Sequence, residues 1–190
     1  MNQDYSNWVW LNEPKHRWEN GNLLITTNSE TGFWQGTHTG FRRDNGHCLL
    51  TEVDKDFSLE AKCKIDKLEN YNQAGLIIRI NNENWITTAL VGVDKNETEI
   101  WSVVTNYGYS DLSKTAVEFN ECHFRVQGKG LDFICEYSKD GKNWANARIA
   151  HLHYYPGRLM VGLYASSPTQ GTETDITYEG LVLEQRKWDD

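Results

Sequence analysis

The feature that most constrains this chain is a two-residue alternation of apolar and polar side chains that recurs from end to end. The cleanest stretch is Phe57–Ile65, where apolar residues occupy the odd positions and polar residues the even ones. Successive side chains of a β-strand point to opposite faces, so this stretch predicts a strand with one buried and one wet face. A helical period of apolar residues is almost absent. We therefore expect an all-β protein.

The same alternation predicts strands along most of the chain. In Leu76–Ile80 three apolar residues share one face, which leaves Ile77 and Arg79 on the opposite face. Trp101–Thr105 is expected to be covered on both faces. About a dozen short strands exceed what one twisted open sheet holds comfortably, so we expect a sandwich of two sheets. Further strands are predicted at Leu23–Thr27, His47–Glu52, Trp85–Val91, Cys122–Gln127, Leu131–Tyr137, Arg158–Tyr164 and Thr174–Leu183.

Turn residues separate these strands. Asn20–Gly21, Asn45–Gly46 and Asp140–Gly141 combine residue types that tolerate positive φ, as tight hairpins require. The stretch Tyr137–Trp144 is the strongest of these signals, because a strand, a turn and a returning segment with an aromatic residue follow each other directly. The chain has three prolines and no Ser/Gly-rich linker. We therefore expect a single domain over residues 1–190.

Ordered motifs across most of the chain carry a resemblance to a known family. The motifs are Trp10–Pro14, Phe33–Phe41, Asp44–His47, Tyr71–Leu76, Asn84–Trp85, Ser102–Thr105 and Tyr137–Gly141. The chain resembles the family called domain of unknown function 1349, which is concanavalin A-like and includes a fungal regulation of enolase protein. The resemblance implies a two-sheet antiparallel jelly-roll sandwich of the concanavalin A-like lectin/glucanase type, and it implies no particular activity.

The chain departs from the pattern of that family at three positions. Thr87 and Val91 stand where the family usually has Lys and Glu, and Leu112 stands where it has Trp. If these residues belong to a family site, this chain has lost them. The departures argue against an enzyme.

The charge balance excludes two classes of partner. The chain has 27 acidic and 19 basic residues, for a net charge of -8. Nucleic-acid binding depends on clustered Lys and Arg, and no basic cluster is present, so no nucleic-acid partner is expected. The same acidity argues against anionic membrane surfaces, and no run of apolar residues is long enough to span a bilayer.

The cysteines and the first residues bear on location. Cys48, Cys63, Cys122 and Cys135 form no C-x-x-C pair, and Cys63 falls on the apolar phase of its strand. The N-terminus lacks the basic start and apolar segment of a signal peptide. We expect free thiols and a cytoplasmic protein. No cofactor is predicted.

The aromatic content suggests a place where a sugar could bind. The chain has 8 Trp, 9 Tyr and 6 Phe, and the segment Phe33–His47 is too polar for a core. Sugar binding uses an aromatic platform and planar polar groups that grip hydroxyls. Trp34 and Trp85 are the predicted platforms. Arg79 either faces a wet groove or pairs with a structural carboxylate, since an unpaired charge in an apolar strand is costly. The predicted ligand-binding residues are Trp34, His38, Asn45, His47, Gln73, Arg79, Trp85 and Asp111.

Other constellations favour ordinary structural roles. Glu52, Asp54 and Asp56 share a strand phase, as glycosidase carboxylates do, but the segment is more typical of a solvated loop. His151 and His153 could hold a metal together, yet no third ligand accompanies them. The stretch 138–144 resembles the Asp-box of sialidases but is one residue short, which favours a simple turn.

Three functional hypotheses follow. The first is a non-catalytic module that binds a carbohydrate or a sugar phosphate in a groove of the concave sheet. The second is a protein-interaction or regulatory domain of carbohydrate metabolism, with a protein partner. The third is a glycoside hydrolase, which needs two carboxylates about 5–10 Å apart on one face.

Overall fold

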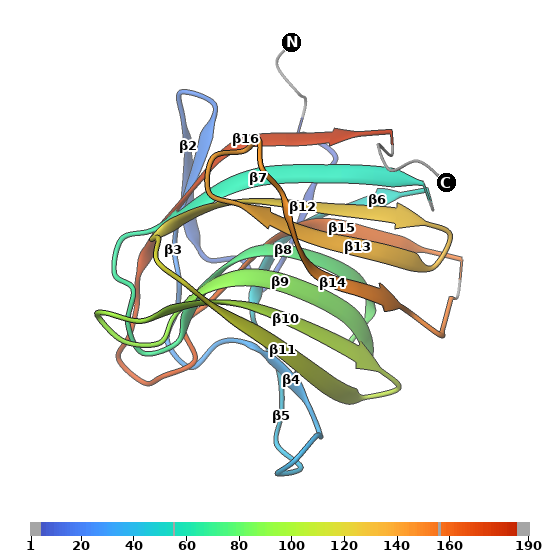
Figure 1. Ribbon diagram of the computed structural model, residues 1–190, viewed down its shortest axis with the longest axis horizontal. Coiled ribbons are helices and arrows are strands. Elements are labelled where there is room, and N and C mark those ends of the chain that lie inside the picture. Colours follow the sequence, from blue (N-terminus) through green and yellow to red (C-terminus); the bar gives the residue numbers. More distant parts are fainter. Residues whose placement is uncertain (1–4, 55, 156, 186–190) are drawn as a thin grey trace.

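The computed structural model describes residues 5–54, 56–155 and 157–185, and all regular elements in this part of the chain are strands. Every strand predicted from the alternation is present. Two antiparallel sheets of seven strands each face one another, with a small hairpin beside them (Figure 1). Among the residues described there is no helix that could cross a membrane.

Sheet A has the strand order β1-β6-β15-β8-β9-β10-β11, and sheet B has the order β14-β13-β12-β7-β16-β3-β2. The strands of sheet A are β1 (Val9–Leu11), β6 (His47–Val53), β15 (Leu159–Ser166), β8 (Asn72–Asn81), β9 (Asn84–Gly92), β10 (Thr98–Asn106) and β11 (Tyr109–Val117). The strands of sheet B are β14 (Ala145–His151), β13 (Asp132–Ser138), β12 (Glu121–Lys129), β7 (Phe57–Ile65), β16 (Asp175–Glu184), β3 (Asn22–Thr26) and β2 (Lys15–Glu19). The hairpin pairs β4 (Phe33–Gln35) with β5 (Arg42–Asp44).

The main core lies between the inner faces of the two sheets. Leu76 and Ile78 of β8 belong to it, as do Leu59 and Cys63 of β7, and all four are almost completely buried. These residues hold the apolar phase of their strands, so the sequence alternation places one face of each strand inward. The predicted two-layer jelly-roll sandwich is therefore confirmed.

A second, smaller apolar cluster covers the outer face of sheet A. Strands β8–β10 arch above the β4–β5 hairpin, which lies on the side away from sheet B (Figure 1). Phe33 of β4 packs there against residues of β6, β8, β9, β10 and β15, including Ile77 and Trp85. This cluster explains why β9 is buried along its whole length. It also explains why Trp101–Thr105 is covered on both faces, as predicted.

The predicted turns have different outcomes. Asn20 and Gly21 have φ values of 51° and 81° and form the tight β2–β3 hairpin, as expected. The prediction for Asn45–Gly46 is wrong, because these residues join β5 to β6, which lie in different sheets. Gly46 is needed for close packing instead: a Cβ there would lie 2.6 Å from the Phe33 ring.

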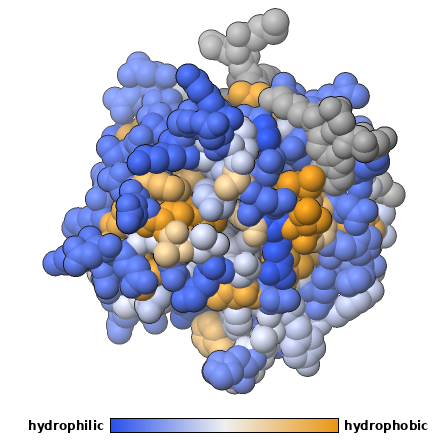
Figure 2. Space-filling model, viewed as in Figure 1, coloured by the Kyte–Doolittle hydropathy of each residue, from blue (hydrophilic) through white to orange (hydrophobic). Residues whose placement is uncertain are grey.

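The surface facing the viewer in Figure 2 is mostly hydrophilic, with apolar patches between the polar side chains. Exposed rings and aliphatic side chains contribute to the surface at the β11 and β14 edges of the two sheets. Tyr109 is 63% exposed and Ile149 is 69% exposed.

Candidate functional site

The β4–β5 hairpin is fixed to sheet A by a bidentate ion pair. Both terminal nitrogens of Arg79 on β8 donate to the carboxylate of Asp44 on β5, each at 2.9 Å. The same guanidinium lies over the Phe33 ring, with its central carbon 5.2 Å from the ring centroid. Two parallel N–H···O bonds fix orientation as well as distance. The hairpin is therefore held at a defined position above the sheet.

Beside the clamped hairpin lies a pocket of about 310 Å³. Aromatic rings from separate segments form its walls: Trp34 and Phe41 come from the hairpin, Tyr71 precedes β8, and Trp101 lies on β10. The Tyr71 and Trp101 rings are 5.9 Å apart at an angle of 46°. A wall of several tilted rings offers flat apolar surfaces in more than one direction.

Tyr71 is presented to the pocket by an uncommon backbone conformation. Asn70 and Tyr71 have φ values of 55° and 64°, in the left-handed region that non-glycine residues rarely adopt. The turn is held by a hydrogen bond from the Tyr71 N–H to the Gly92 carbonyl at 2.7 Å. Left-handed backbone of this kind costs free energy and often accompanies binding sites. At Tyr71 it leaves the ring 44% exposed at the pocket.

Polar groups at the pocket are held by neighbours outside it. The Tyr164 hydroxyl donates to Oε1 of Gln73 at 2.9 Å. This bond fixes the orientation of the amide, and the amide nitrogen can still donate to another partner. Burial raises the pKa of the Tyr164 hydroxyl, so it keeps its proton. The Trp101 ring N–H donates to Glu99, and Lys114 pairs with the same carboxylate at 3.2 Å.

Two of the residues predicted from the sequence line this pocket, namely Trp34 and Gln73. Arg79 does not, since its charge is matched by Asp44 in the structural pair that was the alternative prediction. Trp85 is completely buried beneath Phe33, with ring centroids 5.6 Å apart. A stacking platform needs an exposed ring, so the platform role predicted for Trp85 is corrected to one in the second apolar cluster.

Asn45 and His47 brace the loops around the hairpin. The Asn45 side chain accepts from the Gly32 N–H and donates to the Glu30 carbonyl, both at 3.0 Å. His47 is buried and uses both ring nitrogens in bonds to backbone groups. Both ring nitrogens of His47 are thus used within the fold, and neither residue lines the pocket, so a ligand contact at Asn45 stays a prediction.

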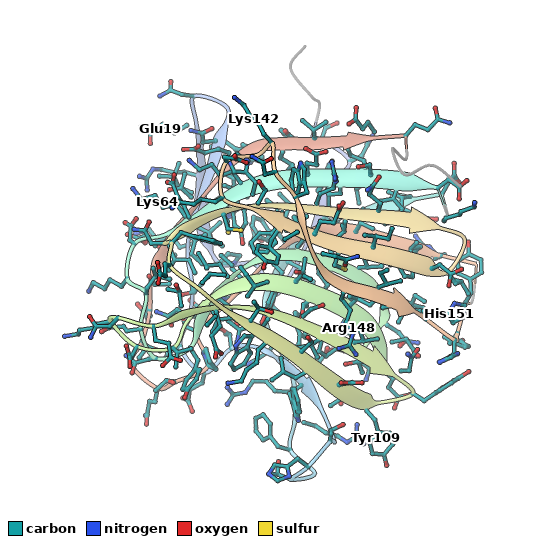
Figure 3. All side chains as sticks on the ribbon, in the orientation of Figure 1. Glu19, Lys64, Tyr109, Lys142, Arg148 and His151 are labelled. Atoms are coloured by element: carbon teal, nitrogen blue, oxygen red, sulfur yellow. The ribbon has the colours of Figure 1, made fainter. Side chains whose placement is uncertain are left out.

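His38 and Asp111 lie apart from the pocket. His38 is exposed in the loop between β4 and β5, with a φ of 72°. Asp111 on β11 pairs with Arg148 on β14 at 3.1 Å, so it links an edge of sheet A to an edge of sheet B. Figure 3 shows Arg148 on β14 where this strand lies over β11.

The other polar groups considered in the sequence form hydrogen bonds with protein neighbours. Glu52 accepts two hydrogen bonds from Arg158, and Asp140 accepts bonds from the turn that follows it, as expected for a simple turn. His151 contacts Asp132 at 2.7 Å, and its ring lies 5.0 Å from that of His153. Within the described part of the chain, no group of three potential ligands is arranged to hold a metal ion.

The predicted set left out several lining residues, among them Phe41, Arg43, Tyr71, Trp101 and Thr169. Phe41 and Arg43 lie within the polar-aromatic segment already noted, and Tyr71 opens a family-like motif. The phase of Trp101 relative to Val103 was a further signal, because both point to the outer face of sheet A. Finding the pocket required knowing that the hairpin folds onto that face.

The three positions that depart from the family pattern lie in β9 and β11. Val91 is opposite Gln73 in the β8–β9 ladder and Thr87 is opposite Ile77, on the outer face of sheet A. Leu112 packs against the second apolar cluster. The departures therefore occur on the face that carries the pocket.

The two antiparallel sheets of seven strands, packed face to face, define an all-β jelly-roll sandwich. Within this class the chain belongs to the family DUF1349, described as a protein of unknown function, which matches residues 10–186. Regulation of enolase protein 1 from Saccharomyces cerevisiae is 32% identical over 178 residues, covering 90% of this chain and 86% of that protein. The family resemblance is thereby confirmed.

Solved structures extend the likeness to the whole fold. A functionally unknown protein from Saccharomyces cerevisiae has a TM-score of 0.89 at 26% identity, covering 98% of this chain and 100% of that chain. The carbohydrate-binding module CBM66 from Bacillus subtilis has a TM-score of 0.56 at 13% identity, covering 94% and 96%. The GH43 BlXynB protein from Bacillus licheniformis has a TM-score of 0.64 at 19% identity, covering 93% of this chain and 34% of that one. The last two similarities show the fold alone.

Proposed function

We propose that this protein is a non-catalytic carbohydrate-binding domain, with one sugar ring held in the pocket on the outer face of sheet A. The observation that carries the proposal is the aromatic pocket. Trp34, Tyr71 and Trp101 offer flat faces for the C–H side of a sugar, and Gln73 offers an amide for its oxygens. Small-molecule sites start at about 300 Å³, so the volume suits a monosaccharide or the end of a chain.

One of the solved structures with this fold is named as a carbohydrate-binding module. Its similarity supports the proposal at the level of fold. Which sugar binds is inferred only from the residues that line the pocket of this chain.

The pocket favours binding over hydrolysis. Glycosidases use a pair of carboxyl groups on either side of the scissile bond. Of the described residues that line the pocket, none is Asp or Glu. Glu99 lies nearby but is 6% exposed and held by Trp101 and Lys114. We therefore do not propose a hydrolase.

A thermal-shift screen tests the proposal. The protein is heated with mono- and oligosaccharides, and a binding sugar raises Tm because it binds the folded state. At about 100 times Kd the expected stabilisation is about 2.7 kcal/mol. Trp34→Ala is expected to remove the shift, because it deletes one wall of the pocket.

Trp144→Ala is the matched control. This ring is half-buried on sheet B, stacked on Arg125 at 4.2 Å, and does not line the pocket. It should keep the sugar response of the wild type. A shift that persists in Trp34→Ala, or that Trp144→Ala abolishes, would place the sugar elsewhere. No shift with any sugar on folded protein would contradict the proposal.

A regulatory protein-interaction domain is the second proposal. It rests on the similarity to Regulation of enolase protein 1 and on exposed rings, including Tyr107 and Tyr109, which are 60% and 63% exposed. Exposed apolar patches are typical of protein interfaces. Figure 3 shows Tyr109 pointing away from the sandwich near the hairpin.

Mixing with purified enolase tests this alternative. A stoichiometric complex in size-exclusion chromatography, lost in Tyr109→Ser, would support it. Separate elution at all concentrations would reject enolase as the partner.

We also propose a cytoplasmic location. All four cysteines are free and buried, and oxidising compartments favour paired cysteines. Cell fractionation with an antibody to this chain tests the location, and recovery in a secreted fraction would oppose it.

A further inference from the structure

The amide nitrogen of Gln73 is a hydrogen-bond donor without a partner among the described residues at the pocket. The indole N–H groups of Trp34 and Trp101 already donate, to the Thr37 carbonyl and to Glu99. The amide of Gln73 accepts from Tyr164 through its oxygen, and no described residue takes a bond from its nitrogen. An amide nitrogen carries two N–H donors. A ligand that meets Gln73 in the pocket is therefore offered donors and must supply acceptors.

Arg43 adds a positive charge to the same wall. Its guanidinium lies over the Phe41 ring at 5.1 Å and donates from Nη1 to the Pro168 carbonyl at 2.9 Å. These contacts fix the group without neutralising it, because a carbonyl carries no net charge. A guanidinium has five N–H donors, so most of them are left for a ligand.

The missing counter-ion is unusual in this acidic chain. Among the described arginines, the two of β5 bond neutral oxygens rather than a carboxylate, and Arg42 does not line the pocket. The other described arginines, each paired with a carboxylate, are Arg17, Arg79, Arg125, Arg148 and Arg158.

We propose that the ligand is an anionic sugar, whose carboxylate or phosphate is bound by Arg43 and Gln73 while the aromatic walls hold the ring. This inference rests on the proposed function and names its substrate class. A guanidinium matches the planar pair of oxygens of either group. Thr169, at the pocket rim, donates its hydroxyl to the Asn70 carbonyl and so keeps only acceptor capacity there, which suits a sugar hydroxyl.

One negative group near the pocket must be weighed. Glu99 lies two residues before Trp101 on β10 and would repel an anion if its charge were free. It is 6% exposed, accepts from the Trp101 indole and pairs with Lys114. A carboxylate matched in this way has little field left at a distance, whereas Arg43 is unmatched and in the wall.

Isothermal titration with matched sugars tests the inference. Glucose is compared with glucuronate and with glucose 6-phosphate, and galactose with galacturonate, so that carboxylate and phosphate are distinguished. We expect an anionic sugar to bind at least about ten-fold more tightly than its neutral parent, since one charge-assisted bond contributes that much. The preference should weaken as salt is raised.

Substitutions on β5 test whether Arg43 causes the preference for an anionic sugar over a neutral one. Arg43→Gln should remove the advantage of the anion over its neutral parent, a ratio of two affinities that is measured within the same variant. Arg43→Lys keeps the charge but loses the fork, and should retain part of the preference. Arg42→Gln removes the same charge from the neighbouring position and should leave the preference intact. Circular dichroism confirms that each variant is folded.

The outcomes separate the inference from the proposed function. Equal binding of neutral and anionic sugars, or a preference that survives Arg43→Gln, overturns the inference and leaves sugar binding standing. Inorganic phosphate is the further probe: binding of phosphate at Arg43 with no sugar bound would overturn the carbohydrate proposal and the sugar part of the inference. If neither sugars nor phosphate bind the folded protein, both are wrong.

Discussion

His47 shows at the residue scale how a polar side chain can be committed to the fold. Its Nδ1–H donates to the Asn12 carbonyl at 2.5 Å, and its Nε2 accepts from the Asn28 N–H at 3.0 Å. This pair of bonds requires the neutral ring, because a protonated Nε2 would face the Asn28 N–H as a second donor. Burial lowers the pKa of His47, and the bond to Asn12 opposes that shift in part.

We therefore expect stability to depend on pH through this residue. An unfolded histidine titrates near about pH 6.5, and the folded pKa of His47 is lower. The contribution of His47 to stability is fully present above the unfolded pKa. It is lost as pH falls from the unfolded pKa toward the folded pKa, because the unfolded chain binds more protons in that range. One proton changes the unfolding free energy by at most about 1.4 kcal/mol per pH unit.

Urea unfolding between about pH 8 and pH 5 measures this dependence. His47→Gln should flatten the acid side of the curve. His38→Asn, at an exposed loop position that Asn tolerates, should leave the shape unchanged. An identical acid slope in wild type and His47→Gln would assign the effect to other groups.

At the scale of elements, the β4–β5 hairpin depends on the Arg79–Asp44 pair. Arg79→Met leaves Asp44 without its cation and releases the hairpin from β8. Removing one partner of a largely buried pair leaves the other uncompensated, so we expect a loss of about 2–3 kcal/mol in unfolding free energy. Sugar binding should weaken as well, because Trp34 and Arg43 belong to the hairpin.

A double-mutant cycle with Asp44→Asn isolates the pair. The double variant should lose less stability than the sum of the two single variants. Arg158→Met, which breaks an exposed pair with Glu52, should cost far less. If the effects of Arg79→Met and Asp44→Asn on unfolding free energy are strictly additive, the Arg79–Asp44 ion pair contributes nothing to stability.

The elements that sequence reasoning found and missed differ in burial. Strands such as β7 alternate clearly because one face is inside and the other wet. β11 was missed because this sheet edge is largely exposed and its polar residues carry no period. β4 and β5 are only three residues long. Trp34 and Gln73 could be predicted from their residue types, but the burial of Trp85 follows from the hairpin lying over it, a long-range contact that no local pattern encodes.

At the scale of the whole molecule, the cysteines are distributed through both apolar clusters. All four are free and nearly fully buried. Burial raises the pKa of the thiol of Cys122 to about 12, and that of Cys135 to about 12 as well. The thiolate is the nucleophile that attacks a thiol reagent, so both burial and the raised pKa protect these groups.

We expect native protein to react slowly with a thiol reagent such as DTNB, and all four thiols to react at once in denaturant. The native labelling rate should follow the population of opened molecules and rise steeply with added urea. A destabilised variant such as Arg79→Met should label faster than wild type. Rapid labelling of one thiol in native conditions would show an accessible cysteine and contradict this expectation.

The pocket walls come from four stretches that are distant in sequence, the hairpin, the turn before β8, the middle of the chain at β10 and the segment after β15. No fragment of the chain brings these stretches together, so a molecule must be folded throughout before a ligand can enter. Ligand binding in the pocket therefore lowers the fraction of unfolded molecules, which is the fraction that cellular proteases degrade. The amount of this protein in a cell should then rise with the supply of its ligand, without any change in its synthesis.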